Sequence, residues 1–512
     1  MTIIPDTYRR RVYLTCCASL ALAGCNGFNG YTFDGTNGGS SGGGSSGSAG
    51  TSSSGGTDAG NTLGGTVSGL AAGSTGFAIQ DGLGHTLLIT AGNNDPFVFP
   101  QTVSPGVTYD VTVQTQPDAP AQLCRVSHAT GVMPVAAVAN IAIKCVTPGR
   151  YLFAAVPFDT TSGTGSVAAF TIDPISGELT AVPGSPYATA QSQPSDIAID
   201  PTGRYLYTPN SGSDNISTDL IGTGGALTLD VSVAATGAAP GAANANSPLS
   251  VTVVPDGTYL YVGSAVNGAN GAIESYALNG GVLSPALGTL AASTFTAGNV
   301  PRSLATAAAS LPTKALLFAG NVHDGTIEDW LVGTDGALTD APGSPLALQS
   351  SGGTSAPYAV AIYPGNNFLY VTDSQGGTVS VYDYYAFGNQ LALIASYSTA
   401  TLFGQSPQGL AIDPTGSFLY VSGSGYVTAF TIDATTGLLS PVGFFQTTGV
   451  TSTNTPTAVR VDPSSQFVYV SNGDAGTISV FEIDFATGAL MPVGRPAQAR
   501  ISNGGPSSMA IE

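Results

Sequence analysis

The most regular pattern in the chain is an apolar strand, a tight polar turn and an aromatic strand, recurring at nearly equal intervals. One unit contains the apolar run Leu410-Ala411-Ile412, the turn Asp413-Pro414-Thr415-Gly416 and the run Phe418-Leu419-Tyr420-Val421. Proline presets φ and glycine accepts positive φ, so this turn favours a sharp reversal. Two further strand-like runs complete each unit. The central aromatic residue recurs at Phe153, Tyr207, Tyr261, Phe318, Tyr370, Tyr420 and Tyr469.

A period of about 50 residues with four strands in each unit is typical of propeller blades. The seven aromatic residues therefore predict seven blades within residues 148–512. The first unit begins at its second strand, near Tyr151, and the chain ends on an unpaired first strand within Pro506–Glu512. Pairing this last strand into the first blade would close the ring and remove its exposed edges.

Residues 61–147 alternate short apolar runs with turns, which favours a small antiparallel β-sandwich ahead of the propeller. This segment contains Cys124 and Cys145, whereas the other three cysteines lie at or before residue 25. Two cysteines in an exported domain most simply form one disulfide. The sequence thus predicts an all-β chain with a disulfide-bonded sandwich followed by a seven-bladed propeller.

The N-terminus has the features of an export signal. Residues 1–24 combine the basic run Arg9-Arg10-Arg11 with a short apolar stretch. The segment Leu22-Ala23-Gly24-Cys25 resembles the bacterial lipobox, which implies cleavage before Cys25 and lipidation of that residue. Asn26 differs from the aspartate of inner-membrane retention signals and so favours the outer membrane. The alternative is an ordinary secretory signal that happens to end near a cysteine.

Residues 25–60 are dominated by Gly, Ser and Thr, a composition that cannot bury a core and that predicts a flexible tether. Charged residues are 8% of the whole chain, against about 25% in an average soluble protein. The formal net charge is −19. Such a surface repels phosphate backbones, so we expect no nucleic-acid partner. No segment has the roughly 20 apolar residues of a transmembrane helix.

The repeats resemble the YVTN and lactonase-type seven-bladed propellers over roughly residues 148–512. The marks of this resemblance are Asp413-Pro414-Thr415-Gly416, Tyr469-Val470-Ser471-Asn472 and the Pro-Gly-Ser-Pro runs at 183–186 and 342–345. Lactonase-type propellers include 6-phosphogluconolactonases and muconate-cyclising enzymes, so the resemblance implies a lactone hydrolase or cyclase. Similar enzymes often place a histidine directly after the proline that opens a blade. Here the corresponding residues are Ser195, Leu249, Arg302, Tyr358, Gln408, Thr457 and Ser507.

The best candidates for chemistry lie in blades three and four. Arg302 opens a first strand, His323 lies between the second and third strands, and Glu274 and Glu328 occupy matching slots at the start of third strands. Propeller topology should bring all four toward one face. A histidine with a carboxylate could act as an acid–base pair, and Arg302 could bind an oxyanion. Surface polar groups that cap turns are the alternative interpretation.

Neither a metal site nor a cofactor is predicted from the loops. Because the ring has few titratable groups, our first hypothesis is a membrane-anchored lipoprotein of the cell envelope. Its propeller would bind or scaffold a protein, a polysaccharide or a small molecule. The alternative is a lactonase-like hydrolase or cyclase of the 6-phosphogluconolactonase-like family. A third hypothesis is a structural envelope protein without a discrete ligand.

Overall fold

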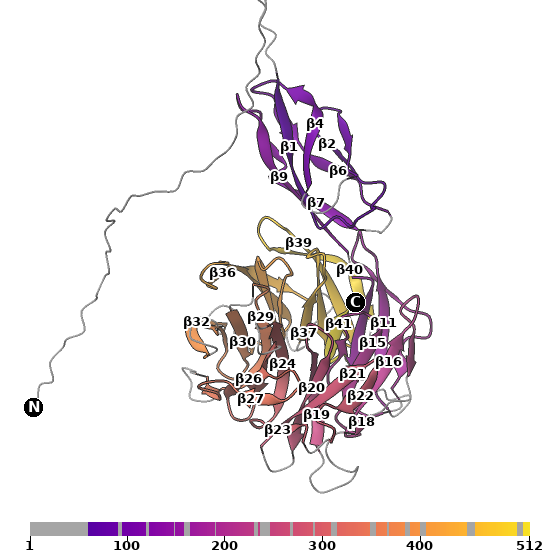
Figure 1. Ribbon diagram of the computed structural model, residues 1–512, viewed down its shortest axis with the longest axis vertical. Coiled ribbons are helices and arrows are strands. Elements are labelled where there is room, and N and C mark those ends of the chain that lie inside the picture. The colour runs from indigo at the N-terminus through magenta and orange to yellow at the C-terminus, as the bar shows by residue number, and fades with distance from the viewer. Residues whose placement is uncertain are drawn as a thin grey trace, which may run out of the picture. The chain divides into compact units, whose positions relative to one another are not determined.

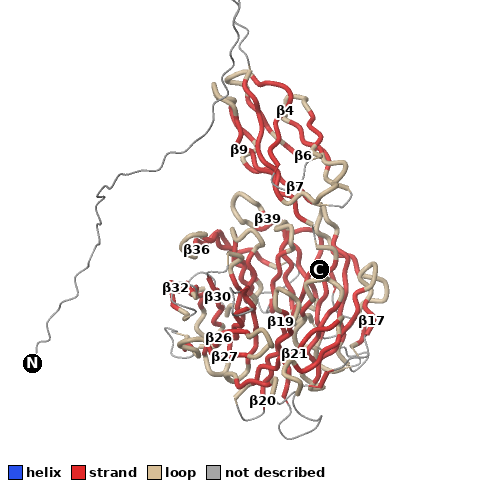
Figure 2. The backbone as a smooth tube through the Cα atoms, viewed as in Figure 1, coloured by secondary structure: helices blue, strands red, loops and turns tan. Residues whose placement is uncertain are grey.

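The fold is taken from a computed structural model. It describes residues 60–90, 95–118, 122–147, 149–157, 164–189, 191–229, 234–235, 246–266, 270–289, 292–308, 315–348, 355–365, 368–384, 390–399, 406–447, 456–498 and 505–512. The predicted signal (1–24), the lipidation site Cys25 and nearly all of the predicted tether (25–60) lie outside these residues. The described chain is built from β-strands joined by loops and turns, as Figure 2 shows.

The segment from residue 60 to 147 forms two small sheets and one short antiparallel strand pair. One sheet has the strand order β4-β1-β9-β7, the other has the order β3-β2-β6, and β5 pairs with β8. These strands are β1 (Asn61–Ser68), β2 (Ala78–Gln80), β3 (Thr86–Leu88), β4 (Asp95–Val103), β5 (Thr108–Asp110), β6 (Thr112–Thr115), β7 (Leu123–Ser127), β8 (Thr130–Val132) and β9 (Val138–Val146). Both sheets contribute to one buried cluster that includes Val67, Ile79, Phe99 and Ile141.

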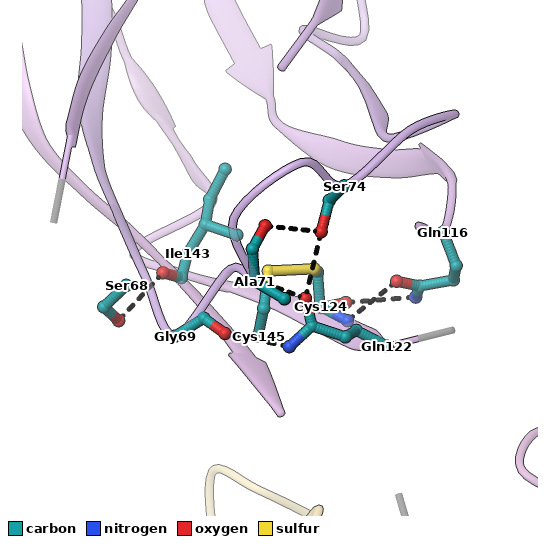
Figure 3. Close-up of a disulfide and its surroundings, with 9 residues drawn as sticks. All are labelled: Ser68, Gly69, Ala71, Ser74, Gln116, Gln122, Cys124, Ile143 and Cys145. Atoms are coloured by element: carbon teal, nitrogen blue, oxygen red, sulfur yellow. Dashed lines mark hydrogen bonds between the residues drawn. A yellow bond between two sulfur atoms is a disulfide. The ribbon is translucent and has the colours of Figure 1, made fainter. Parts of the chain in front are cut away.

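Cys124 and Cys145 are paired directly across the antiparallel strands β7 and β9, and their sulfur atoms are bonded (Figure 3). Two glutamine side chains hold the chain around this pair. Gln116 bonds both the N–H and the carbonyl oxygen of Cys124, at 2.7 and 3.1 Å. Gln122 donates to the carbonyl oxygen of Gly69 at 2.9 Å and accepts from the N–H of Ala71 at 2.7 Å. The disulfide thus lies in a well-bonded corner of the sandwich.

Seven further sheets follow, each with four strand positions in the described chain. The first positions are β41 (Ser508–Ile511), β14 (Ala198–Ile199), β19 (Asn246–Val253), β24 (Pro301–Ala308), β29 (Pro357–Ile362), β33 (Leu410–Ile412) and β37 (Pro456–Val461). The second positions are β10 (Tyr151–Val156), β15 (Tyr205–Asn210), β20 (Tyr259–Val266), β25 (Ala315–Asn321), β30 (Phe368–Asp373), β34 (Phe418–Gly423) and β38 (Phe467–Asn472). The third positions are β11 (Ser166–Ile172), β16 (Asn215–Ile221), β21 (Ala272–Asn279), β26 (Thr326–Val332), β31 (Thr378–Asp383), β35 (Tyr426–Ile432) and β39 (Thr477–Ile483).

The fourth strand separates the first four blades from the last three. In blades one to four it is split into two short pieces, and in blades five to seven it is continuous. The split strands are β12 (Leu179–Ala181) with β13 (Tyr187–Ala188), β17 (Leu227–Leu229) with β18 (Ala234–Ala235), β22 (Val282–Pro285) with β23 (Thr294–Thr296), and β27 (Leu338–Asp340) with β28 (Leu346–Ala347). The continuous strands are β32 (Ala392–Ser398), β36 (Leu439–Gln446) and β40 (Leu490–Gln498). The two Pro-Gly-Ser-Pro runs lie at such breaks, because proline cannot donate to the ladder.

The first strands form a closed ring: β14, β19, β24, β29, β33, β37 and β41 each contact the next, and β41 contacts β14. The last strand pairs with the first blade, since β41 runs antiparallel to β10 with Phe153 opposite Ala510. Figure 1 shows the yellow strand β41 beside the purple strands of this blade. The predicted propeller and its mode of closure are therefore confirmed.

The aromatic residues that define the repeat pack each blade against its neighbour. Tyr261, Tyr370, Tyr420 and Tyr469 are fully buried. Each of their hydroxyls donates to a glycine carbonyl oxygen in the next blade, at 2.8–3.2 Å; these glycines are Gly336, Gly437, Gly488 and Gly177. Burial raises the pKa of all four phenols, so they remain neutral donors at physiological pH.

The turn after each first strand is held by an aspartate where the motif is complete. Asp413 accepts from the N–H of Phe418 at 2.6 Å and from the N–H of Thr415 at 3.0 Å, and it also binds the Thr415 hydroxyl. Gly416 has a φ of +74°. It lies against the ring of Tyr363, where a Cβ would come within 2.7 Å, so both the backbone and the packing require glycine.

Candidate functional site

The first strands enclose a cavity of about 370 Å³ on the ring axis, and residues of all seven blades line it. Its wall is built from residues that directly follow the blade-opening prolines and from the strands that continue after them. Each blade contributes a short stretch of its first strand, so residues far apart in sequence face one space. This volume falls within the ordinary range of small-molecule sites.

The residues after the opening prolines are part of this wall. Of the seven positions at which the lactonase-type resemblance implied a histidine, six line the cavity: Ser195, Leu249, Arg302, Tyr358, Thr457 and Ser507. The remaining one is Gln408, whose neighbour Gly409 lines it. The repeat register read from the sequence therefore identifies the wall of the cavity.

The structure describes all four predicted site residues, and of these only Arg302 lines the cavity. It is the second residue of β24, and its Nη2 donates to the hydroxyl of Tyr358 at 2.9 Å. The guanidinium carbon also lies 4.9 Å from the centre of the Tyr358 ring. The neighbouring blade thus fixes the position of this cation by a hydrogen bond and a cation–π contact.

Two charged residues of the cavity wall were not among the sequence-based candidates. Asp196 follows Ser195 in blade two, and Arg460 is the fifth residue of β37 in blade seven. Asp196 accepts from the N–H of Val251 at 3.0 Å and from the Ser508 hydroxyl at 2.6 Å. Burial lowers the pKa of Arg460, and the charge of Asp196 acts in the opposite direction. Both lie on blade-opening segments, so the repeat register was the signal that could have found them.

The hydroxyls of the wall serve mainly to join the blades. Ser195 donates to the carbonyl oxygen of Pro248 at 2.9 Å, and Thr457 donates to that of Pro506 at 2.8 Å. Ser250, which is fully buried behind the lining residues Leu249 and Val251, donates to the carbonyl oxygen of Pro301 at 2.7 Å. Each bond runs from one blade to the opening proline of the next. The charged groups, rather than these hydroxyls, are therefore the residues available for chemistry.

The structure places His323 away from the residues that line the cavity. It lies in the turn between β25 and β26, where it is exposed, and its backbone N–H donates to the carbonyl oxygen of Asn299 at 3.3 Å. Asp324, the next residue, accepts from the N–H of Asn299 at 2.6 Å. This turn holds the segment that leads into β24.

Glu328 and Glu274 bind groups within their own part of the propeller. Glu328, on β26, accepts from the N–H of Gly298 at 2.7 Å and from the side-chain nitrogen of Asn321 at 3.1 Å. Burial raises the pKa of Glu328, and these two bonds oppose that effect. Glu274, on β21, is fully buried and accepts from the Tyr276 hydroxyl at 2.8 Å. The sequence predicted that these four residues lie toward one face. Instead, Arg302 lines the cavity, His323 lies in an exposed turn, and Glu274 and Glu328 are held within the blades.

Within the described ranges, no group of three or more His, Cys, Asp or Glu side chains is arranged to hold a metal ion. The same residues contain no helix with the length and apolar character needed to cross a membrane. The charged residues of the cavity wall can donate hydrogen bonds to an anion and accept a proton, which suits acid–base and oxyanion chemistry.

The profile of a protein family described as lactonase, seven-bladed β-propeller matches residues 143–451. A 6-phosphogluconolactonase of Pectobacterium atrosepticum is 35% identical over 85 residues, which are 16% of this chain and 24% of that protein. The match thus spans about a quarter of the length of that relative.

Solved structures agree in fold. A candidate 6-phosphogluconolactonase of Bacteroides uniformis superposes with a TM-score of 0.56 at 17% identity, covering 71% of this chain and 99% of that one. The periplasmic gluconolactonase of Pseudomonas aeruginosa gives a TM-score of 0.56 at 18% identity, covering 70% of this chain and 99% of the other. Because the family profile covers more than half of the sequence, the chain belongs to the lactonase family of seven-bladed β-propellers.

Proposed function

We propose that this protein is a lactone hydrolase and that the reaction takes place in the cavity on the propeller axis. The observation that carries the proposal is the convergence of Asp196, Arg302 and Arg460, from three different blades, on one cavity of about 370 Å³. Membership of the lactonase family supports it. The names of the relatives, 6-phosphogluconolactonase and gluconolactonase, make sugar lactones the first substrates to test.

The reaction needs water as its only co-reactant. The carboxylate of Asp196 takes a proton from a water molecule as its oxygen bonds to the lactone carbonyl carbon. An arginine of the cavity stabilises the negative charge that develops on the carbonyl oxygen. The ring C–O bond then breaks, and the proton passes from Asp196 to the departing ring oxygen. The product is a hydroxy acid, which ionises and releases one proton per turnover.

Asp196 is suited to this role because hydrogen bonds hold its carboxylate in place and because it lines the cavity. Its two oxygens are oriented by the Ser508 hydroxyl and by the N–H of Val251, which come from the blades on either side. Carboxylate oxygens have more than one acceptor site each, so both can still bind water. This arrangement resembles a general base held by its neighbours.

We further propose that the enzyme works in the bacterial cell envelope, anchored to the outer membrane through a lipidated Cys25. The support is the lipobox-like segment at residues 22–25 and the Gly/Ser-rich run that follows it. The tether at residues 25–60 would then hold the folded domains away from the membrane surface. Mass spectrometry of the mature N-terminal peptide tests this proposal, because lipidation adds acyl chains to residue 25 alone.

The test of the hydrolase proposal is proton release by the purified full chain on a panel of sugar and aliphatic lactones. Rates are taken above those of spontaneous hydrolysis. We expect turnover that falls by roughly 10²–10⁴-fold in Asp196→Asn, the usual contribution of a general base. His323→Ala is the matched control, since it changes an exposed side chain outside the cavity wall, and it should retain activity. Absence of turnover on every lactone would instead favour the binding or scaffold hypothesis for the same cavity.

A further inference from the structure

The two arginines of the cavity differ in what they already bind. Arg302 donates to the Tyr358 hydroxyl and lies over the Tyr358 ring. Arg460 donates from Nη1 to the carbonyl oxygen of its own neighbour Val459 at 2.9 Å. A guanidinium has five N–H donors in a planar fork, a geometry that matches a carboxylate. Each arginine thus makes one hydrogen bond to the described residues, and the Arg302 guanidinium is held in addition by the Tyr358 ring.

Arg460 occupies a position in the cavity wall at which the other blades carry small residues. Counted from the opening proline of each blade, the six residues that correspond to Arg460 are small: Ala198, Thr252, Ala305, Ala361, Ala411 and Ala510. Ala361 and Ala411 line the same cavity as Arg460. One long cationic side chain thus lies in a ring of small ones.

The charge of Arg460 is only partly balanced by the protein. Burial lowers its pKa, and Asp196 is the acid that opposes this effect. Among the described residues, the ion pairs within 4.0 Å are His85–Asp81 and Arg150–Glu512. Asp196 therefore acts on the charge of Arg460 without forming an ion pair with it within 4.0 Å. A buried cation in this situation gains from an anion that binds next to it.

We infer that Arg460 binds the carbonyl oxygen of the lactone as negative charge develops on it, and then binds the carboxylate of the ring-opened product. The inference rests on the proposed hydrolase function and assigns the orientation of the substrate. The acyl group faces Arg460 and Asp196, between blades seven and two. The rest of the sugar ring faces Arg302 and Tyr358, in blades four and five, where hydroxyl groups can bind the phenol and the guanidinium.

The kinetic test compares Arg460→Ala with Arg302→Ala on glucono-δ-lactone. Removing an oxyanion donor usually costs about 10²–10³ in kcat. We expect a loss of that order in kcat for Arg460→Ala, with partial recovery when guanidinium is added at millimolar concentration. Arg302→Ala should mainly raise KM, because it removes binding that is equal in the ground and transition states. A loss of kcat in Arg302→Ala alone, with Arg460→Ala unaffected, would overturn the assignment and leave the hydrolase proposal standing.

A binding test separates failure of the assignment from failure of the proposed function. Sodium gluconate is titrated calorimetrically into the wild-type full chain, Arg460→Ala and Arg460→Lys. We expect at least about tenfold weaker binding to Arg460→Ala and an intermediate value for Arg460→Lys, which keeps the charge but not the planar fork. The same pattern without lactone turnover would reject the hydrolase and retain the anion site. Equal affinity in all three proteins, each shown to be folded by its thermal transition, would reject the anion site.

Discussion

Charged side chains occur in two very different settings in this propeller. Within blades three and four, the carboxylates of Glu274 and Asp329 are almost completely buried, at 0% and 3% exposure. On the ring axis, Asp196, Arg302 and Arg460 line a cavity of about 370 Å³. The carboxylates in the blades are enclosed by strands and loops, whereas the charges on the axis face a space that a ligand can enter. Ionisation in the first setting affects mainly the free energy of unfolding, and charge in the second setting is available for chemistry.

The difference follows from strand position. Glu274 and Asp329 lie on third strands, which have a neighbouring strand on each side, so their side chains pack between blades. Asp196 and Arg460 lie on blade-opening segments, which form the innermost edge of each blade and face the axis. We therefore expect substitutions in the blades to change the free energy of unfolding and to leave turnover per folded molecule unchanged.

The largest effect on stability is expected at Asp329. Burial raises its pKa to about 7, and the charges of Glu328 and Asp340 raise it further, while a bond with Ser344 opposes this. The folded state thus binds a proton more tightly than the unfolded state, so stability falls as pH rises from about 4 to about 7. Asp329→Asn, which carries no titrating group, should lose this dependence and be more stable at pH 8 by up to about 4 kcal/mol. Denaturant unfolding across pH 4–8 measures it, and parallel curves for the two proteins would contradict the prediction.

A smaller effect is expected at Glu274. Glu274→Ala removes the acceptor of the buried Tyr276 hydroxyl and should destabilise the protein by about 1–3 kcal/mol. Glu274→Gln is the matched control, because its amide oxygen can still accept that bond. Thermal unfolding gives the stabilities, and lactone turnover should be normal in both variants below their transitions. Loss of turnover in a folded Glu274→Gln protein would show that the blade carboxylates also take part in the chemistry.

Ser250→Ala tests whether the hydroxyls near the axis join blades. In the wild type, the Oγ of Ser250 donates to the carbonyl oxygen of Pro301 in the next blade at 2.7 Å, and the side chain is fully buried. We expect a loss of about 1 kcal/mol in the free energy of unfolding. Ser440→Ala, at an exposed position on β36, should have almost no effect. Equal stability of the two variants would show that the Ser250 hydroxyl does not stabilise the contact between the blades.

The smallest effect is expected at the ion pair between Arg150 and Glu512. The Arg150 side chain is 66% exposed, so water and salt screen its attraction to Glu512. Arg150→Ala should cost less than about 1 kcal/mol, and the difference should shrink at high salt. Urea unfolding at low and high ionic strength measures this. A large loss that salt does not change would mean that ring closure depends on this pair more than on the β10–β41 ladder.

Much of the fold could be predicted from the sequence, and less of the site could. The seven aromatic residues and the Asp-Pro-Thr-Gly turns fixed the number of blades, because each blade repeats the same local chemistry. The position after each opening proline was also recognised, and six of these seven residues line the cavity. His323, Glu274 and Glu328 were grouped because they lie in adjacent blades, but distance along the axis and depth within a blade are not visible in a repeat alignment.

The sequence by itself determined the strand periodicity, the blade count and the closing strand, since these depend on local turn geometry and on the alternation of apolar residues. Only the tertiary structure decided which polar residues share a space. Asp196 and Arg460 are separated by more than 260 residues of chain, and closure of the ring brings them to one cavity wall. Charge pairs of this kind are set by the packing of whole blades, and no local pattern records them.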